Sequence, residues 1–98
     1  MNINVKKSTE EIIIEVEGRL DTTTAPNLDQ AINEVVNNTK KLVLDIKALE
    51  YISSAGLRVL LSAQKKMQKT GSMIVKNVCE EIMEIFDMTG FTDILTIE

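Results

Sequence analysis

Hydrophobic and polar positions alternate in two stretches near the start of the chain. The first stretch contains Ile3 and Val5, and the second contains Ile12, Ile14 and Val16. Alternation of this kind predicts strands with one buried face. The polar residues 8–10 between them predict a turn, so we expect an antiparallel hairpin whose second strand ends at Gly18.

Apolar residues recur at helical spacing in three later segments. In chain order they are Leu28, Ala31, Ile32, Val35 and Val36, then Leu57, Leu60, Leu61 and Met67, then Ile82, Met83, Ile85 and Phe86. We expect Thr24 to cap the first helix, with Pro26 in its first turn, where the missing N–H would have no partner anyway. We expect the second helix over residues 55–69, with Gly71 just beyond its end, and Gly90 as the stop of the third.

Short apolar runs between the helices predict further strands. They span residues 42–46 and 73–75, residues 47–53 are expected to form a loop, and residues 95–97 are expected to add an edge strand. A hairpin followed by strand–helix alternation favours parallel strands joined by right-handed crossovers. The predicted fold is a single small α/β domain over residues 1–98, with a mixed, mostly parallel sheet of four to five strands and three to four helices.

Composition excludes several classes of function. The chain has 98 residues and a formal net charge of −4, which argues against a nucleic-acid-binding protein. One cysteine, Cys79, cannot form an internal disulfide, and the N-terminus lacks the apolar stretch of a secretory leader. No apolar run is long enough to insert into a membrane. We therefore expect a cytoplasmic protein.

The chain has no histidine, which excludes Ser-His-Asp catalysis, histidine phosphotransfer and histidine-based metal sites. A single cysteine gives no zinc site of the usual kind, and no acidic loop resembles a calcium site. We therefore expect a protein that is not an enzyme and has no cofactor and no bound metal.

The candidate chemistry lies where the central strand passes into the second helix. Ser53 and Ser54 lie there, near the positive end of the helix dipole, where a hydroxyl can cap the helix or carry a phosphate. Gly56 in the first turn costs about 1 kcal/mol relative to alanine. Either close packing on a strand or the close approach of another molecule would explain it.

Three other features have plain structural explanations. Cys79 and the methionines after Met1 are expected to pack in or near the core. Asp45 interrupts an apolar strand, which predicts a polar partner near the strand end. Lys65, Lys66 and Lys69 lie near the negative end of the second helix and form either a solvated face or a surface for an acidic partner.

Three segments resemble one known family. Residues 51–61, Tyr-Ile-Ser-Ser-Ala-Gly-Leu-Arg-Val-Leu-Leu, resemble the signature of STAS domains, specifically the bacterial anti-sigma factor antagonists. Residues 18–28 are similar to the family's Gly-x-Leu-Asp and Thr-Ala-Pro-x-Leu block, and residues 85–91 to its closing helix and Thr-Gly-hydrophobic turn. The segments follow the family's order and span nearly the whole chain.

The resemblance implies a protein that changes partners through one serine. In its unphosphorylated form it binds an anti-sigma factor that is also a serine kinase, and a serine phosphatase resets the switch. In the family motif an Asp precedes the acceptor serine and a Ser or Thr follows it. Counting back from Gly56 places the acceptor at Ser54, with Ser53 at the Asp position and Ala55 at the position after it. Ser53 is the alternative acceptor.

The resemblance also implies a set of partner-contacting residues. They are Asp21, Thr22, Thr23, Thr24, Ser53, Ala55, Gly56 and Arg58. For Asp21, a role as a loop-capping carboxylate is the alternative.

Two other functions stay open at this level. One is a constitutive STAS subunit of a larger assembly, such as a stress-signalling particle or a lipid transporter, without a phosphorylation switch. The other is a nucleotide-binding or nucleotide-hydrolysing protein, although the chain has no glycine-rich loop of P-loop type.

Overall fold

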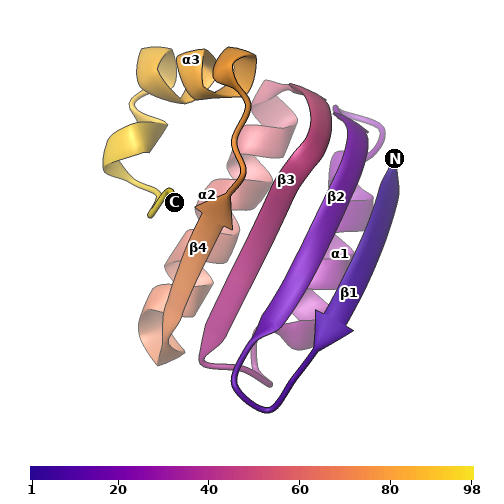
Figure 1. Cartoon of the computed structure of the whole chain (residues 1–98), viewed down its shortest axis with the longest axis vertical. Coiled ribbons are helices and arrows are strands. Elements are labelled where there is room, and N and C mark those ends of the chain that lie inside the picture. The colour runs from indigo at the N-terminus through magenta and orange to yellow at the C-terminus, as the bar shows by residue number, and fades with distance from the viewer.

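A four-stranded sheet in the order β1-β2-β3-β4 organises the computed structural model, which describes residues 1–98 (Figure 1). The strands are β1 (Asn2–Lys7), β2 (Ile12–Leu20), β3 (Lys41–Ile52) and β4 (Ser72–Lys76). β1 pairs antiparallel with β2, while β2–β3 and β3–β4 are parallel. The predicted hairpin and the mixed, mostly parallel sheet are therefore confirmed.

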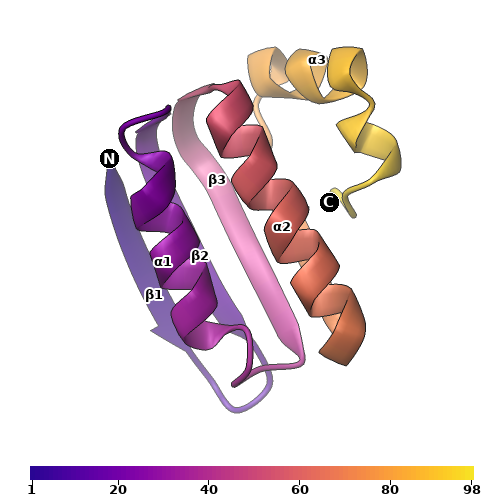
Figure 2. The ribbon, with the colours of Figure 1, turned by 180° about the vertical axis from the view of Figure 1, so that it is seen from behind.

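Two helices cover one face of the sheet. α1 (Ala25–Val35) and α2 (Ser54–Thr70) lie behind the strands in Figure 1 and in front of them in Figure 2. α3 (Glu80–Thr89) lies beyond the carboxyl end of β4 and is followed by a short 3-10 turn, η1 (Phe91–Asp93). None of the helices combines the length and apolar character needed to span a bilayer.

The core lies between the sheet and the helices. Ile14, Leu44, Val75 and Phe86 have no exposed surface, and 24 buried residues form one continuous cluster. Burying each large apolar side chain contributes roughly 1.5–3 kcal/mol, so the predicted apolar stripes account for the way these elements pack. Cys79 and Met83 pack against the same cluster and Met67 and Met73 lie within it, as predicted. The packing prediction is wrong for Met88, which is 86% exposed near the end of α3.

The two central strands are longer than predicted. Gly18 does not end β2: it has a φ of 100°, and the pairing with β3 shifts register between Gly18 and Arg19 while the strand continues to Leu20. The expected loop at residues 47–53 is likewise wrong, because β3 continues to Ile52. A bulge lets a strand bend and absorb an extra residue, which breaks the alternation on which the prediction relied.

The end of the chain also differs from the prediction. Residues 95–97 form no strand; Ile97 makes one isolated parallel bridge to Val75.

Two glycines follow helices, as predicted. Gly71 caps the end of α2 with an extended backbone rather than a left-handed one. Glycine is needed there because a Cβ would collide with the carbonyl group of Lys40. Gly90, with a φ of 81°, ends α3 in the left-handed conformation, as a glycine stop predicts.

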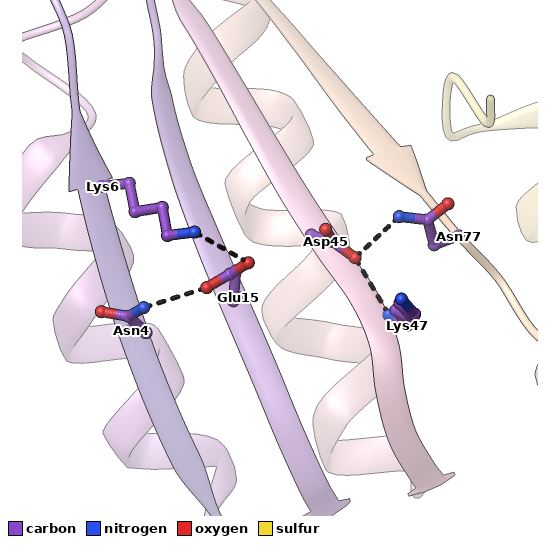
Figure 3. Close-up of polar contacts among 6 residues, drawn as sticks. All are labelled: Asn4, Lys6, Glu15, Asp45, Lys47 and Asn77. Carbon is purple, nitrogen blue, oxygen red and sulfur yellow. Dashed lines mark hydrogen bonds and ion pairs between the residues drawn. The ribbon is translucent and has the colours of Figure 1, made fainter.

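The face of the sheet opposite α1 and α2 is uncovered and carries polar contacts between strands (Figure 3). Glu15 accepts a hydrogen bond from the Asn4 side chain at 2.9 Å and lies 3.4 Å from the Lys6 ammonium. Exposed contacts of this kind each contribute little to stability. They give a polar character to the part of this face around Glu15.

Asp45 lies on the same open face, and the structure confirms its predicted polar partner. Its Oδ1 accepts from the side-chain amide of Asn77 at 3.0 Å and from the backbone N–H of Lys47 at 3.1 Å (Figure 3). Asn77 directly follows β4. The carboxylate therefore joins β3 to the segment that leads into α3.

Candidate functional site

The carboxyl ends of β2 and β3 bring two of the family-like segments together. Leu20 and Ile52 form the last paired positions of these strands, and the backbone N–H of Ser53 donates to the carbonyl of Leu20 at 2.8 Å. The chain then enters α1 from β2 and α2 from β3, so both helices begin at this edge of the sheet (Figure 2). Residues 21–24 and 53–56 therefore lie next to one another.

The two serines of this junction have different surroundings. Ser53 is the N-cap of α2: its backbone is extended and its Oγ accepts from the N–H of Gly56 at 3.4 Å. Ser54 is the first residue of the helix, its side chain is exposed, and its hydroxyl makes no hydrogen bond within the chain. The helix therefore uses the hydroxyl of Ser53 and leaves that of Ser54 free.

Asp21 organises the loop before α1. Its Oδ1 accepts from the Thr23 hydroxyl at 2.7 Å, from the Thr23 N–H at 3.0 Å and from the Thr24 N–H at 3.2 Å. The hydrogen bond from the Thr23 side chain, followed by the backbone bonds, lowers the pKa of Asp21 below its ordinary value. The loop-capping explanation of Asp21 thus accounts for Oδ1, whereas Oδ2 has no partner in the chain.

Thr24 occupies the predicted N-cap position of α1, but its side chain does not cap the helix. Its hydroxyl donates to the carbonyl of Arg19 at 2.7 Å and accepts from the N–H of Asp21 at 2.8 Å. These bonds tie the loop to the end of β2. The loop shape is therefore fixed by its own side chains before any partner arrives.

Gly56 is buried against the ends of the two central strands. A Cβ at this position would lie 2.7 Å from Cγ of Leu20 and 2.9 Å from Cγ1 of Ile52, closer than packed atoms tolerate. Close packing of the helix start against the strands therefore explains this glycine. The predicted partner contact at Gly56 stays a prediction.

The other predicted contact residues lie around this edge with graded exposure. Thr22, Thr23 and Arg58 are exposed, while Ala55 is half-buried. The structure thus brings the predicted residues of both segments to one end of the molecule. Their contact with a partner stays a prediction.

An aromatic–cation pair beside the serines was not predicted. The guanidinium carbon of Arg19 lies 4.3 Å from the centre of the Tyr51 ring, and the two residues are register partners on β2 and β3. Arg19 makes no hydrogen bond or ion pair with another side chain, and Tyr51 is 39% exposed. The pair depends on the bulged register between β2 and β3, which the alternation of apolar residues does not predict.

The site offers exposed hydroxyls, one carboxylate oxygen and the guanidinium groups of Arg19 and Arg58. No three carboxylate or thiol side chains come together to hold a metal ion. The amino-terminal ends of two helices favour negative charge at this edge. The arrangement can therefore accept a phosphoryl group from an external donor and present a polar surface to another protein.

Comparison with known proteins identifies the family. Residues 2–98 match the model of the STAS domain. The anti-sigma-B factor antagonist of Bacillus subtilis (strain 168) is 30% identical over 98 residues, a match that covers 99% of this chain and 90% of that protein.

Solved structures agree with this match. A crystal structure of an anti-sigma factor antagonist from Mycobacterium paratuberculosis superimposes with a TM-score of 0.89 at 28% identity, covering 98% of this chain and 83% of the other. The Bacillus cell fate determinant SpoIIAA in its phosphorylated form gives a TM-score of 0.78 at 15% identity, covering 99% and 91% of the two chains. At that identity the likeness to SpoIIAA concerns the fold alone.

Proposed function

This chain belongs to the STAS domain family, and from that premise we propose that it is an anti-sigma factor antagonist controlled by phosphorylation of Ser54. In the unphosphorylated state it binds an anti-sigma factor that is also a serine kinase, and the sigma factor is released. Phosphorylation separates the complex, and a serine phosphatase restores the binding form. The chain itself catalyses no reaction in this cycle.

The observation that carries this proposal is the difference between the two serines. Ser54 is exposed and free of hydrogen bonds, whereas Ser53 caps α2. A kinase can reach the free hydroxyl without breaking an interaction of the fold. This difference supports Ser54 over Ser53 as the acceptor.

The physics of the switch follows from the position of Ser54. A phosphate adds about −1.5 to −2 charge at pH 7. At the first residue of α2 that charge faces the positive end of the helix dipole, so the modified chain keeps its fold. Within an interface the same group is bulky and must lose water. A loss of about 4 kcal/mol in binding corresponds to roughly a thousandfold release.

One experiment tests the proposal and separates it from its rivals. The chain is incubated with ATP alone and then with a purified serine-kinase anti-sigma factor from its own cell, and phosphate is mapped by mass spectrometry. We expect kinase-dependent phosphate on Ser54 in the wild type and in Ser53→Ala, and none in Ser54→Ala. Binding is expected to survive in Ser54→Ala and to fall about a thousandfold in the phosphorylated chain.

Other outcomes favour the alternatives. If the kinase leaves the chain unmodified and Ser54→Asp binds as tightly as the wild type, the chain is a constitutive STAS subunit. ATP turnover by the chain alone would favour a nucleotide-hydrolysing protein. Phosphate on Ser53 alone would retain the switch and overturn the choice of serine.

A further inference from the structure

We infer that α2 carries a docking surface for an acidic patch of the partner protein, extending from the junction toward the far end of the helix. The surface, called the basic stripe here, consists of Arg58, Lys65, Lys66 and Lys69. The inference rests on the proposed function, because it names a surface through which the anti-sigma factor would bind. It adds lysines that lie about three to four turns away from the proposed phosphorylation site.

Charge on this chain is distributed unevenly. α2 contains four of the 11 Lys and Arg residues and none of the 15 Asp and Glu residues. The chain as a whole has a net charge of −4. The basic stripe is therefore a local positive surface on an acidic protein.

Helical geometry aligns the basic stripe with Ser54. Residues 54, 58, 61 and 65 are separated by four, three and four positions, which places them on one side of a helix. A shallow groove on this side is lined by Arg58, Leu61, Ser62, Lys65, Lys66 and Lys69. From residue 54 to residue 69 the helix rises by roughly 22 Å. A partner that contacts Ser54 can therefore reach the lysines along the same face.

Three of the four charges in the stripe are free to meet a partner. Arg58, Lys65 and Lys69 are exposed and make no hydrogen bond or ion pair within the chain; Lys66 donates to the side-chain oxygen of Asn33 on α1. Neither of the two ion pairs in the molecule involves α2. Asp29, the acidic residue of α1 one turn before Asn33, accepts from that Asn33 side chain rather than from a lysine.

Helix stability alone does not explain the basic stripe. Lys69 lies in the last turn, where a cation is favoured, but Arg58 lies in the second turn, where the helix dipole gives a cation no support. Lys65 and Lys69 are a like-charged pair four residues apart, an arrangement that slightly destabilises a helix. An exposed helix selected for solubility would alternate signs along this face. The pattern instead fits an external acidic surface.

The size and surroundings of the basic stripe favour a protein partner over a polyanion. A nucleic acid or an anionic membrane would extend past the stripe and meet the negative charge of the remaining surface, since residues 77–98 contain six acidic residues and no basic one. A protein can present a compact acidic patch of matching length. Complementary charge of this kind mainly accelerates association and depends on salt.

The test compares two variants with the same net charge. K65Q/K66Q/K69Q removes three cations from the basic stripe, and K7Q/K47Q/K76Q removes three cations that lie on the strands. Association of each variant and the wild type with the purified anti-sigma factor is measured at about 30 mM and about 500 mM NaCl. Thermal unfolding establishes that both variants are folded.

We expect the stripe variant to associate about tenfold more slowly at low salt, the strand variant to change less than twofold, and the difference to vanish at high salt. Equal slowing of both variants would mean that only net charge matters, and it would overturn the inference while leaving the proposed function intact. If the wild type does not bind the anti-sigma factor at all, the inference and the proposed function both fail. Stripe-dependent binding to duplex DNA or anionic vesicles, with unchanged binding to the anti-sigma factor, would also overturn it.

Discussion

Adjacent residues at the β3–α2 junction have separate structural roles. Ser53 satisfies the N–H of Gly56, Ser54 exposes a free hydroxyl, and Gly56 lets the helix approach the strands. Because these roles belong to different atoms, substitutions can separate stability from binding. The first residue-scale prediction uses this separation, and the second concerns the loop before α1.

Gly56→Ala should destabilise the chain although alanine favours a helix. The added Cβ would meet Leu20 and Ile52, which are buried and cannot move aside without shifting the core. Overpacking costs about 1–3 kcal/mol and the helix preference of alanine returns about 1 kcal/mol. Because the two contacts would be 2.7 and 2.9 Å, we expect an overpacking cost in the upper half of that range and a net loss of about 1–2 kcal/mol by urea unfolding. Ser54→Ala is the control, with a change within about 0.5 kcal/mol; a Gly56→Ala variant as stable as the wild type would contradict the packing explanation.

The loop around Asp21 should respond to acid at an unusually low pH. Its hydrogen bonds require the ionised carboxylate, and they lower its pKa from the ordinary 3.8. The stability they provide is therefore fully present above pH 3.8 and is lost as the pH falls through the lower folded-state pKa. An NMR titration of the Asp21 carboxyl carbon should show a midpoint below 3.8.

A matched pair of variants tests the cause of this shift. Thr23→Ala removes the hydroxyl that donates to Asp21, so the midpoint should move up toward the ordinary value. Thr22 makes no hydrogen bond to the carboxylate, and Thr22→Ala should leave the midpoint unchanged. Equal midpoints in the two variants would show that the Thr23 hydroxyl is not the main cause.

At the scale of elements, periodicity predicted the helices better than the ends of the central strands. The apolar stripe of α2 predicted a helix over residues 55–69, and the helix spans Ser54–Thr70. The alternation of apolar and polar residues did not predict these strand ends, because the pairing of β2 and β3 shifts register next to Gly18 and within residues 47–52. Each extra residue turns the side chains that follow it to the opposite face of the sheet. The candidate site could be predicted from the sequence because its two segments directly follow predicted strands. The Arg19–Tyr51 pair could not be predicted, because it depends on the register between β2 and β3.

Gln64 is the exception within the buried face of α2. It is 6% exposed, and its side-chain oxygen has no hydrogen-bond partner. A buried acceptor without a partner costs about 1–3 kcal/mol. Gln64→Met keeps nearly the same shape without the polar group, so we expect a gain of about 1 kcal/mol and a rise in Tm of about 4–8 °C.

Gln68 supplies the control for this prediction. It lies one turn further along α2 and is exposed, so Gln68→Met should change the stability by less than about 0.5 kcal/mol. Differential scanning calorimetry compares the two variants directly. A loss of stability in Gln64→Met would show that the amide makes an interaction that the folded chain needs.

At the scale of the whole molecule, the proposed binding surfaces and the C-terminal segment lie on different elements of the fold. The proposed switch and the basic stripe lie on the side of α1 and α2, whereas α3 and the final residues complete the core beside β4 (Figures 1 and 2). Val75 of β4 accepts from the N–H of Glu98 and donates to the carbonyl of Thr96, each at 2.9 Å. These bonds cover the outer edge of β4, which would otherwise be open to pairing with another chain.

The final segment should therefore contribute to stability without affecting the switch. Leu95 is 6% exposed and belongs to the core cluster, while its neighbour Ile94 is 40% exposed. Leu95→Ala should cost about 2–4 kcal/mol because it leaves a cavity. Ile94→Ala should cost no more than about 0.5 kcal/mol. Urea unfolding measures both values.

Binding to the anti-sigma factor supplies the second measurement on the same pair. Below the unfolding transition, both variants should bind with wild-type affinity, because Leu95 and Ile94 belong neither to the β3–α2 junction nor to the basic stripe. Equal stabilities for the two variants would show that the segment does not close the core. Weaker binding by the folded Ile94→Ala variant would show that the partner also contacts this end of the molecule, and the docking surface would then extend beyond α2.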